Sequence, residues 1–188
     1  MENIAIAGSF ASGKSFVLNC IKSMDYMVFS CDDFIREAYK DAKLQDIVVS
    51  KIEGLEVFDK KKLSKIIYDN PQSRKELESI IHPIVGSGIR KFEEINKNQK
   101  FIFTEVPLLF ESNFDEYFSY SICVYCLEET RWQRAKERGI RSIDLYNKIK
   151  LVQLDQEEKK RKSGFAINSD TNQREIKKSL EKIIKKIS

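Results

Sequence analysis

The sequence predicts an α/β protein with a parallel five-stranded sheet, covered by helices on both faces in three layers. Two observations carry this prediction. Apolar, strand-like segments alternate with amphipathic helical segments along the chain, an order typical of parallel sheets. Near the N-terminus, the apolar residues 4–7 lead into Gly-Ser-Phe-Ala-Ser-Gly-Lys-Ser at residues 8–15, and an amphipathic stretch follows. This succession indicates a strand, a glycine-containing loop and a helix.

The octapeptide at residues 8–15 fits the phosphate-binding pattern G-x-x-x-x-G-K-[ST]. Backbone N–H groups of such a loop form an anion-binding nest, and the following helix adds the positive end of its dipole. Lys14 brings a charge to the outer phosphates, and the Ser15 hydroxyl is a ligand for Mg²⁺. We therefore predict a P-loop NTPase-type fold that binds a nucleoside triphosphate with Mg²⁺. The predicted nucleotide contacts are Gly8, Ala11, Ser12, Gly13, Lys14, Ser15 and Phe16.

The remaining elements follow from apolar periodicity and from cap residues. The predicted strands are residues 3–7, 26–30, 101–106, 120–127 and 164–167. The predicted helices are residues 14–24, 32–43, 44–51, 59–69, 71–97, 128–138, 142–162 and 170–187. Asp59 and Asn70-Pro71 mark two helix starts. Pro83 is expected to break the long helix at 71–97, because proline removes a donor and clashes with the preceding turn.

Length and composition indicate one domain in the cytoplasm. The chain has 188 residues and a formal net charge of +4, which is long enough for one sizeable core. No apolar run approaches the roughly 18 residues that a membrane helix needs, and the N-terminus lacks the features of a signal peptide. Basic residues gather after residue 128, mostly on helix faces expected to be solvated. We predict no membrane or nucleic-acid partner, and a monomer or weak homo-oligomer.

The chain has four cysteines, which we expect to be buried structural thiols. Cys123 and Cys126 form a C-x-x-C pair, but they fall in a predicted strand, where residues three apart point to opposite faces. The single histidine leaves a zinc site few ligands.

Three segments with candidate functional residues follow predicted strands, at residues 8–15, 30–33 and 105–111. Ligands of parallel sheets bind beyond the carboxyl ends of the strands, so these segments should face one crevice. The segment at about 37–97 is helical and longer than a single crossover needs. It is predicted to be an inserted subdomain that holds the substrate.

Carboxylates in these segments are candidates for chemistry. Asp32 or Asp33 could accept or orient the proton of an acceptor hydroxyl, although either could instead cap a helix. Glu105, at the end of the third strand, is the candidate to contact Mg²⁺ directly or through water. Glu111 is expected to cap a helix or to pair with a lysine.

Four arginines at helical spacing form a further cluster. Their planar guanidinium groups suit phosphate oxygens, and on a mobile segment they could close over the triphosphate. We expect at least two of them to contact phosphate; the alternative is a solvated face paired with Glu128, Glu129 and Glu137. The four are Arg131, Arg134, Arg138 and Arg141.

Together, these motifs resemble the dephospho-CoA kinase family over nearly the whole chain. The resemblance is carried by residues 8–15, Ser30-Cys31-Asp32 with Arg36, Ile81-His82-Pro83, Val106-Pro107-Leu108-Leu109-Phe110-Glu111, the arginines from Arg134, and Gln153. It implies transfer of the ATP γ-phosphoryl group to the ribose 3′-hydroxyl of dephospho-coenzyme A, the last step of coenzyme A synthesis. It also implies a nucleotide core at about 1–36, 98–130 and 163–188, a helical CoA-binding insertion at about 37–97, and a lid at about 131–162.

The resemblance also implies roles for individual residues. Asp32 would be the base toward the 3′-hydroxyl, and Lys14 would hold the phosphates. The same resemblance makes Arg134 and Arg138 lid residues, and it places Arg36 and His82 toward the acceptor.

The sequence departs from the family pattern at several positions. Ser30 stands where the family usually has the first Asp of D-x-D, and Ser9 and Ala11 replace glycines of the loop. Ala11 is expected to fit only with a negative φ. The usual A-D-x-V-I-x-N element is blurred at residues 163–169. Two alternatives stay open: another P-loop small-molecule kinase, of the nucleotide or shikimate type, and a nucleotide-binding regulator whose chemistry has decayed.

Overall fold

The computed structural model describes residues 1–188, and the chain packs as two compact units. The sheet unit consists of Met1–Ser30 and Glu93–Ser188, and the helical unit of Cys31–Phe92. No helix in the chain is both long enough and apolar enough to cross a lipid bilayer.

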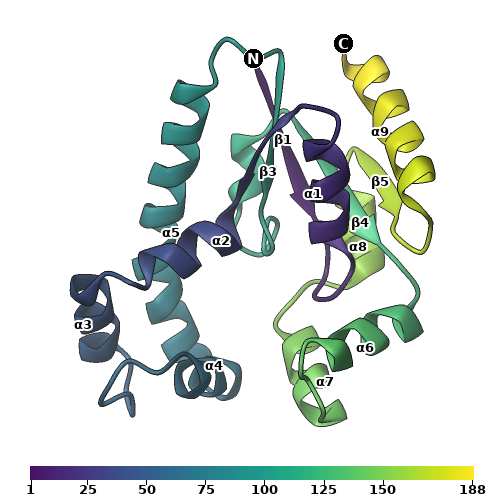
Figure 1. Cartoon of the computed structure of the whole chain (residues 1–188). Helices are drawn as coiled ribbons and strands as arrows, with labels where there is room; N and C mark the ends of the chain where they lie inside the picture. The colour runs from purple at the N-terminus through teal and green to yellow at the C-terminus, as the bar shows by residue number, and fades with distance from the viewer. The chain divides into compact units, whose positions relative to one another are not determined.

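The sheet unit contains one five-stranded sheet in the order β2-β3-β1-β4-β5 (Figure 1). Every neighbouring pair of strands is parallel. The predicted parallel five-stranded sheet is therefore confirmed. The strands are β1 (Glu2–Ala7), β2 (Met27–Ser30), β3 (Phe101–Glu105), β4 (Tyr120–Tyr125) and β5 (Phe165–Asn168). β1 lies at the centre, between β3 and β4, because its residues are apolar and buried on both faces.

Helices cover both faces of this sheet. α1 (Lys14–Lys22) and α9 (Gln173–Ile187) share the main core with the strands, where Ile4, Phe103 and Ile176 are among the buried residues. In Figure 1, α9 runs beside β5. α8 (Gln156–Lys162) contacts β4. Nζ of its Lys160 lies 4.2 Å from the ring centroid of Tyr125, which points to the opposite face from Ile122 and Val124. The result is three layers.

The helical unit has a core of its own. It contains α2 (Cys31–Ala38), α3 (Ala42–Lys51), α4 (Lys60–Asp69) and most of α5 (Pro71–Ile95). The predicted caps are confirmed: Asp59 accepts a hydrogen bond from the backbone N–H of Lys62, and the Asn70 side chain accepts from Gln72. The buried apolar residues of this core are Leu44, Val48, Ile52, Leu55, Leu63 and Leu77.

The predicted break at Pro83 is wrong, because α5 is one unbroken helix of 25 residues, Pro71–Ile95, with Pro83 inside it. Pro83 is exposed, whereas Leu77 before it and Val85 and Ile89 after it are buried. Proline inside a helix costs about 3 kcal/mol. Burying apolar side chains on both sides contributes roughly 1.5–3 kcal/mol per residue, which outweighs that cost.

Two other helix boundaries differ from the prediction. The helix predicted at 142–162 is two helices, α7 (Ile143–Leu151) and α8, because the Asp155 side chain accepts from the N–H of Glu157 and starts α8 afresh. Likewise, α2 ends at Ala38, and the Asp41 side chain caps α3. Between β3 and α7 lie the short 3₁₀ helix η1 (Phe114–Tyr117), β4 and α6 (Glu128–Glu137).

The interpretation of the cysteines as structural thiols is confirmed. All four are buried and none forms a disulfide. Burial raises the pKa of the Cys123 thiol to about 11, so the reactive thiolate is disfavoured there. No group of three or more His, Cys, Asp or Glu side chains is arranged to hold a metal ion.

Candidate functional site

The predicted phosphate loop connects β1 to α1 in the sheet unit. Gly8 has φ 154°, and a side chain there would place its Cβ 2.5 Å from the backbone oxygen of Val124. Gly13, with φ 93°, is the N-cap residue of α1, and no side chain caps that helix. The loop therefore offers the N-terminus of α1 to an anion.

Ala11 adopts φ 60°, so the expectation of a negative φ at this position is wrong. The left-handed conformation costs roughly 1–2 kcal/mol for a residue with a Cβ. Ala11 is buried in a small apolar cluster with Ala135 of α6 and Tyr146 of α7. Burial of the methyl group against these helices offsets part of the backbone cost and attaches the loop to α6 and α7.

Phe10 is held by three side chains from the predicted lid. Its backbone N–H donates to Oε1 of Gln153 at 2.8 Å, and its carbonyl accepts from Nε of Arg131 at 3.2 Å. The Arg138 guanidinium lies 5.9 Å from the Phe10 ring centroid, within cation–π range. Phe10, the second variable residue of the loop, thus links the loop to residues 131–162. The spacing of residues in the sequence did not indicate this link.

Arg134 connects α6, the end of β5 and the phosphate loop. Its guanidinium donates to Oγ of Ser169 at 2.8 Å and to the Ser169 carbonyl at 2.9 Å. The Ser169 hydroxyl in turn donates to the Ser12 carbonyl at 2.6 Å. Ser169 lies in the segment where the family pattern is blurred, so the sequence carried no signal for this role.

Replacing Gly13 by alanine is expected to destabilise the protein more than the same change at Gly139. Both glycines have a positive φ, 93° and 89°. A Cβ at Gly13 would lie 2.6 Å from Oγ of Ser169 and 2.8 Å from Nη1 of Arg134, whereas nothing lies within 4 Å at Gly139. Urea unfolding should show an extra loss of about 1–3 kcal/mol for Gly13→Ala. Equal losses would mean that backbone strain alone matters.

Lys14 and Glu105 are both buried where the strands end. Nζ of Lys14 donates to the carbonyls of Gly8 at 3.0 Å and Ser9 at 3.2 Å, so its charge lies over the loop. Glu105, at 4% exposure, pairs in register with Ser30, whose hydroxyl donates to Oε2 of Glu105 at 2.6 Å. The departure at Ser30 therefore puts a hydrogen-bond donor beside Glu105 in place of a second carboxylate.

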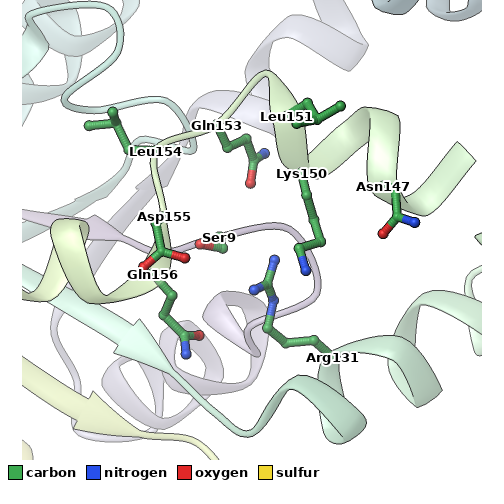
Figure 2. Close-up of a pocket in the computed structure, with 9 residues that line it drawn as sticks. All are labelled: Ser9, Arg131, Asn147, Lys150, Leu151, Gln153, Leu154, Asp155 and Gln156. Atoms are coloured by element: carbon green, nitrogen blue, oxygen red, sulfur yellow. The ribbon is translucent and has the colours of Figure 1, made fainter. Parts of the chain in front are cut away.

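A pocket of about 380 Å³ opens between the loop and the predicted lid (Figure 2). Arg131 from α6 and Lys150 from α7 point toward each other there, and the Gln153 amide points inward. Ser9 is buried, and its Oγ has no hydrogen-bond partner. The cations Arg131 and Lys150 line this pocket together with one carboxylate, Asp155. It is lined by Ser9, Arg131, Asn147, Lys150, Leu151, Gln153, Leu154, Asp155 and Gln156.

Glu128 balances the cations beside this pocket. Its carboxylate lies 2.9 Å from Nη1 of Arg131 and 2.6 Å from Nζ of Lys150, and it accepts from the Tyr146 hydroxyl at 3.1 Å. Desolvation raises the pKa of Glu128, but the hydrogen bond from Lys150 and the charge of Arg131 outweigh it, so the pKa is lowered overall. Of the four predicted arginines, the structure brings Arg131, Arg134 and Arg138 to the loop; Arg141 is exposed at the start of the α7 connection.

Three predicted site residues belong to the helical unit. Asp32 is exposed in the first turn of α2, where a negative charge is favourable. Arg36 pairs with Asp33 at 2.7 Å, and both side chains are more than half exposed. The pKa of Tyr68 is raised by burial and, secondarily, by the Asp32 charge. His82 is partly buried on α5.

The sheet order, the glycine loop and the helix that follows it define the class of protein: this is a phosphate-loop kinase fold. A Thermus thermophilus crystal structure has the same fold, with a TM-score of 0.81 at 24% identity over 100% of this chain and 98% of that one. A family model described as dephospho-CoA kinase matches residues 3–175. The chain belongs to the dephospho-CoA kinase family.

Two further similarities agree with this membership. A Rickettsia typhi protein named dephospho-CoA kinase is 41% identical over 187 residues, covering 100% of this chain and 98% of the relative. The structure of dephospho-CoA kinase from Campylobacter jejuni is 25% identical and has a TM-score of 0.66, covering 99% of this chain and 96% of that one.

Proposed function

We propose that this chain is a kinase that transfers the γ-phosphoryl group of ATP to the ribose 3′-hydroxyl of dephospho-coenzyme A, giving coenzyme A and ADP. Family membership over nearly the whole length is the observation that carries the proposal. The intact phosphate loop, with Lys14 buried over it, supports the use of a nucleoside triphosphate. The cytoplasmic location and the monomer or weak homo-oligomer stay predictions.

In the proposed reaction, the loop and Lys14 hold the β- and γ-phosphates. Arg131 and Arg134 come from α6 and Arg138 is its C-cap residue. Their positive charge would stabilise the charge that spreads over the transferring group. Asp32 is proposed to accept the proton of the 3′-hydroxyl as that oxygen attacks phosphorus. Its exposed position at the start of α2 leaves the carboxylate accessible to a substrate. Arg36 and His82 are proposed to contact the acceptor.

The residues present fit a bound Mg²⁺. Ser15 and Glu105 are the proposed protein contacts, and both offer the oxygen donors that this ion prefers. Mg²⁺ bound with ATP is commonly held by one or two protein oxygens together with the phosphates, which suits a chain that has no cluster of metal-binding side chains. When bound, the ion would neutralise charge on the phosphate oxygens. The hydrogen bond from the Ser30 hydroxyl to Oε2 of Glu105 would set how this carboxylate faces the ion.

The substrate assignment is tested by an acceptor panel. The purified chain should phosphorylate dephospho-CoA with ATP and Mg²⁺, and the product should carry the new phosphate on the ribose 3′-oxygen, as read by mass spectrometry and ³¹P NMR. Shikimate and nucleoside monophosphates serve as competing acceptors from the same fold class. Turnover of one of these without turnover of dephospho-CoA would overturn the proposal. Binding of ATP with no transfer to any acceptor would favour the regulator.

A further inference from the structure

Lys159 is a buried charge for which the proposed reaction has no use. Its side chain is 0% exposed, and Nζ lies 2.8 Å from Oε1 of Glu111 and 3.3 Å from the carbonyl of Pro107. Glu111 is itself largely buried, at 15% exposure of its side chain. Taking two charges out of water is costly, so the pair calls for an explanation beyond stability.

Glu111 also holds the segment between α7 and α8, residues 152–155, which we call the strap. The oxygen that binds Lys159, Oε1, accepts the backbone N–H of Leu154 at 2.8 Å. Lys159 therefore fixes Glu111, and Glu111 fixes the strap at its third residue. Of the two roles expected for Glu111, a helix cap or a pair with a lysine, the structure shows the lysine pair and adds the strap as a second partner.

The strap reaches the phosphate loop one residue earlier. Gln153, directly before Leu154, accepts the N–H of Phe10 through Oε1 at 2.8 Å. On the other side of the strap, Gln156 exchanges hydrogen bonds with the backbone of Cys126, at 2.9 and 3.3 Å. The strap is therefore bonded to the segment after β3 and to the loop after β1, and α8, which follows it, is bonded to the residue after β4. Figure 2 shows Gln153 pointing toward the loop from this connection.

We propose that Glu111 and Lys159 are positioning residues for nucleotide binding: they hold the strap so that Gln153 keeps the Phe10 amide, and with it the phosphate loop, in the shape that receives the triphosphate. Both side chains are buried away from solvent, at 0% and 15% exposure, and act through the strap. This inference deepens the proposed function. It rests on that function only in taking the phosphate loop as the ATP-binding site. Loss of Lys159 would leave Glu111 as an unpaired buried carboxylate, which would turn toward water and release Leu154.

The test is a double-mutant cycle on ATP affinity, measured by calorimetry without acceptor. Lys159→Met and Gln153→Ala are each expected to weaken ATP binding about 5- to 10-fold, as expected for one net hydrogen bond. The double variant should be no weaker than the worse single variant, because both changes break the same chain of contacts. Lys160→Met is the matched control, since Lys160 pairs with the exposed Glu157 on the same helix; it should bind ATP like the parent.

A purely structural role would give a different pattern. It would lower the melting temperature of Lys159→Met while leaving the ATP affinity of the folded protein unchanged. Alternatively, the fold-losses in ATP affinity of Lys159→Met and Gln153→Ala would multiply in the double variant. Either result overturns the proposal. If Lys159→Met does not fold, Glu111→Gln combined with Lys159→Met removes both charges but keeps an acceptor for Leu154, and it should bind ATP within about 3-fold of the parent. Weak ATP binding by this folded pair would also overturn it.

Because ATP affinity is read without acceptor, this outcome is independent of the acceptor panel. A parent that binds ATP but does not use dephospho-CoA would overturn the proposed function and leave the cycle interpretable. If the parent uses dephospho-CoA but the losses of ATP-binding free energy in the two single variants add up in the double variant, only the positioning role is overturned.

Discussion

Asp32→Asn is expected to lower the turnover of dephospho-CoA by about 10²-fold or more, while ATP affinity stays within about 2-fold of the parent. Asparagine has nearly the same size and shape, but its amide cannot take a proton from the ribose hydroxyl. Asp32 is exposed and lies in the first turn of α2, so the loss of its charge should cost the fold only about 0.3–1 kcal/mol. Steady-state kinetics with saturating ATP measures the effect.

The neighbouring carboxylate supplies the control. Asp33 lies in the same helical turn and pairs with Arg36 at 2.7 Å, with both side chains exposed, and exposed pairs contribute about 0–1 kcal/mol. Asp33→Asn should therefore keep turnover within a few-fold of the parent. Near-normal turnover of Asp32→Asn, or an equal loss in both variants, would contradict the assignment of Asp32 as the base.

Lys14→Met is expected to reduce turnover by about 10²- to 10³-fold and to weaken ATP binding, because it removes a charge placed where the phosphates develop negative charge. Nζ of Lys14 lies over the carbonyls of Gly8 and Ser9, and the side chain is buried. Methionine fills similar space without a charge. Single-turnover kinetics with excess enzyme separates the loss in phosphoryl transfer from the loss in binding.

Lys22→Met is the matched control for this variant. Lys22 is exposed at the last position of α1, the same helix that Lys14 begins. Its removal takes away one positive charge without touching the loop, so turnover should be unchanged. A Lys14→Met variant that transfers phosphate at the parent's rate would show that the loop does not hold the reacting nucleotide.

The order of strands and helices could be predicted because its signals are local. An apolar run such as residues 4–7, a cap at Asp59 and a cap with proline at Asn70-Pro71 each act within a few residues, and the structure confirms the elements they mark. The phosphate loop was predictable for the same reason, since its residues are consecutive in the chain.

The errors concern residues whose conformation depends on packing or on a cap that the apolar pattern did not reveal. Pro83 stays inside a helix because buried residues on both sides of it hold α5 together. Ala11 adopts a positive φ, and its partners in the apolar cluster come from two other helices. The break before Asp155 separates α7 from α8; the strap there is held by Glu111 and by the loop. The cap at Asp155 is a local signal, whereas the packing around Pro83 and Ala11 is not carried by any local pattern.

The sequence alone therefore determined the fold class and the phosphate loop, because each depends on consecutive or regularly spaced side chains. The family resemblance selected Asp32, Arg36 and His82 for the proposed chemistry. The tertiary structure decided what surrounds the loop. Gln153 meets Phe10 across 143 positions, and Ser169 meets Ser12 across 157. Contacts at such separations depend on how the strands order themselves in the sheet, with β1 between β3 and β4, and that order is a property of the packed core and not of any one segment.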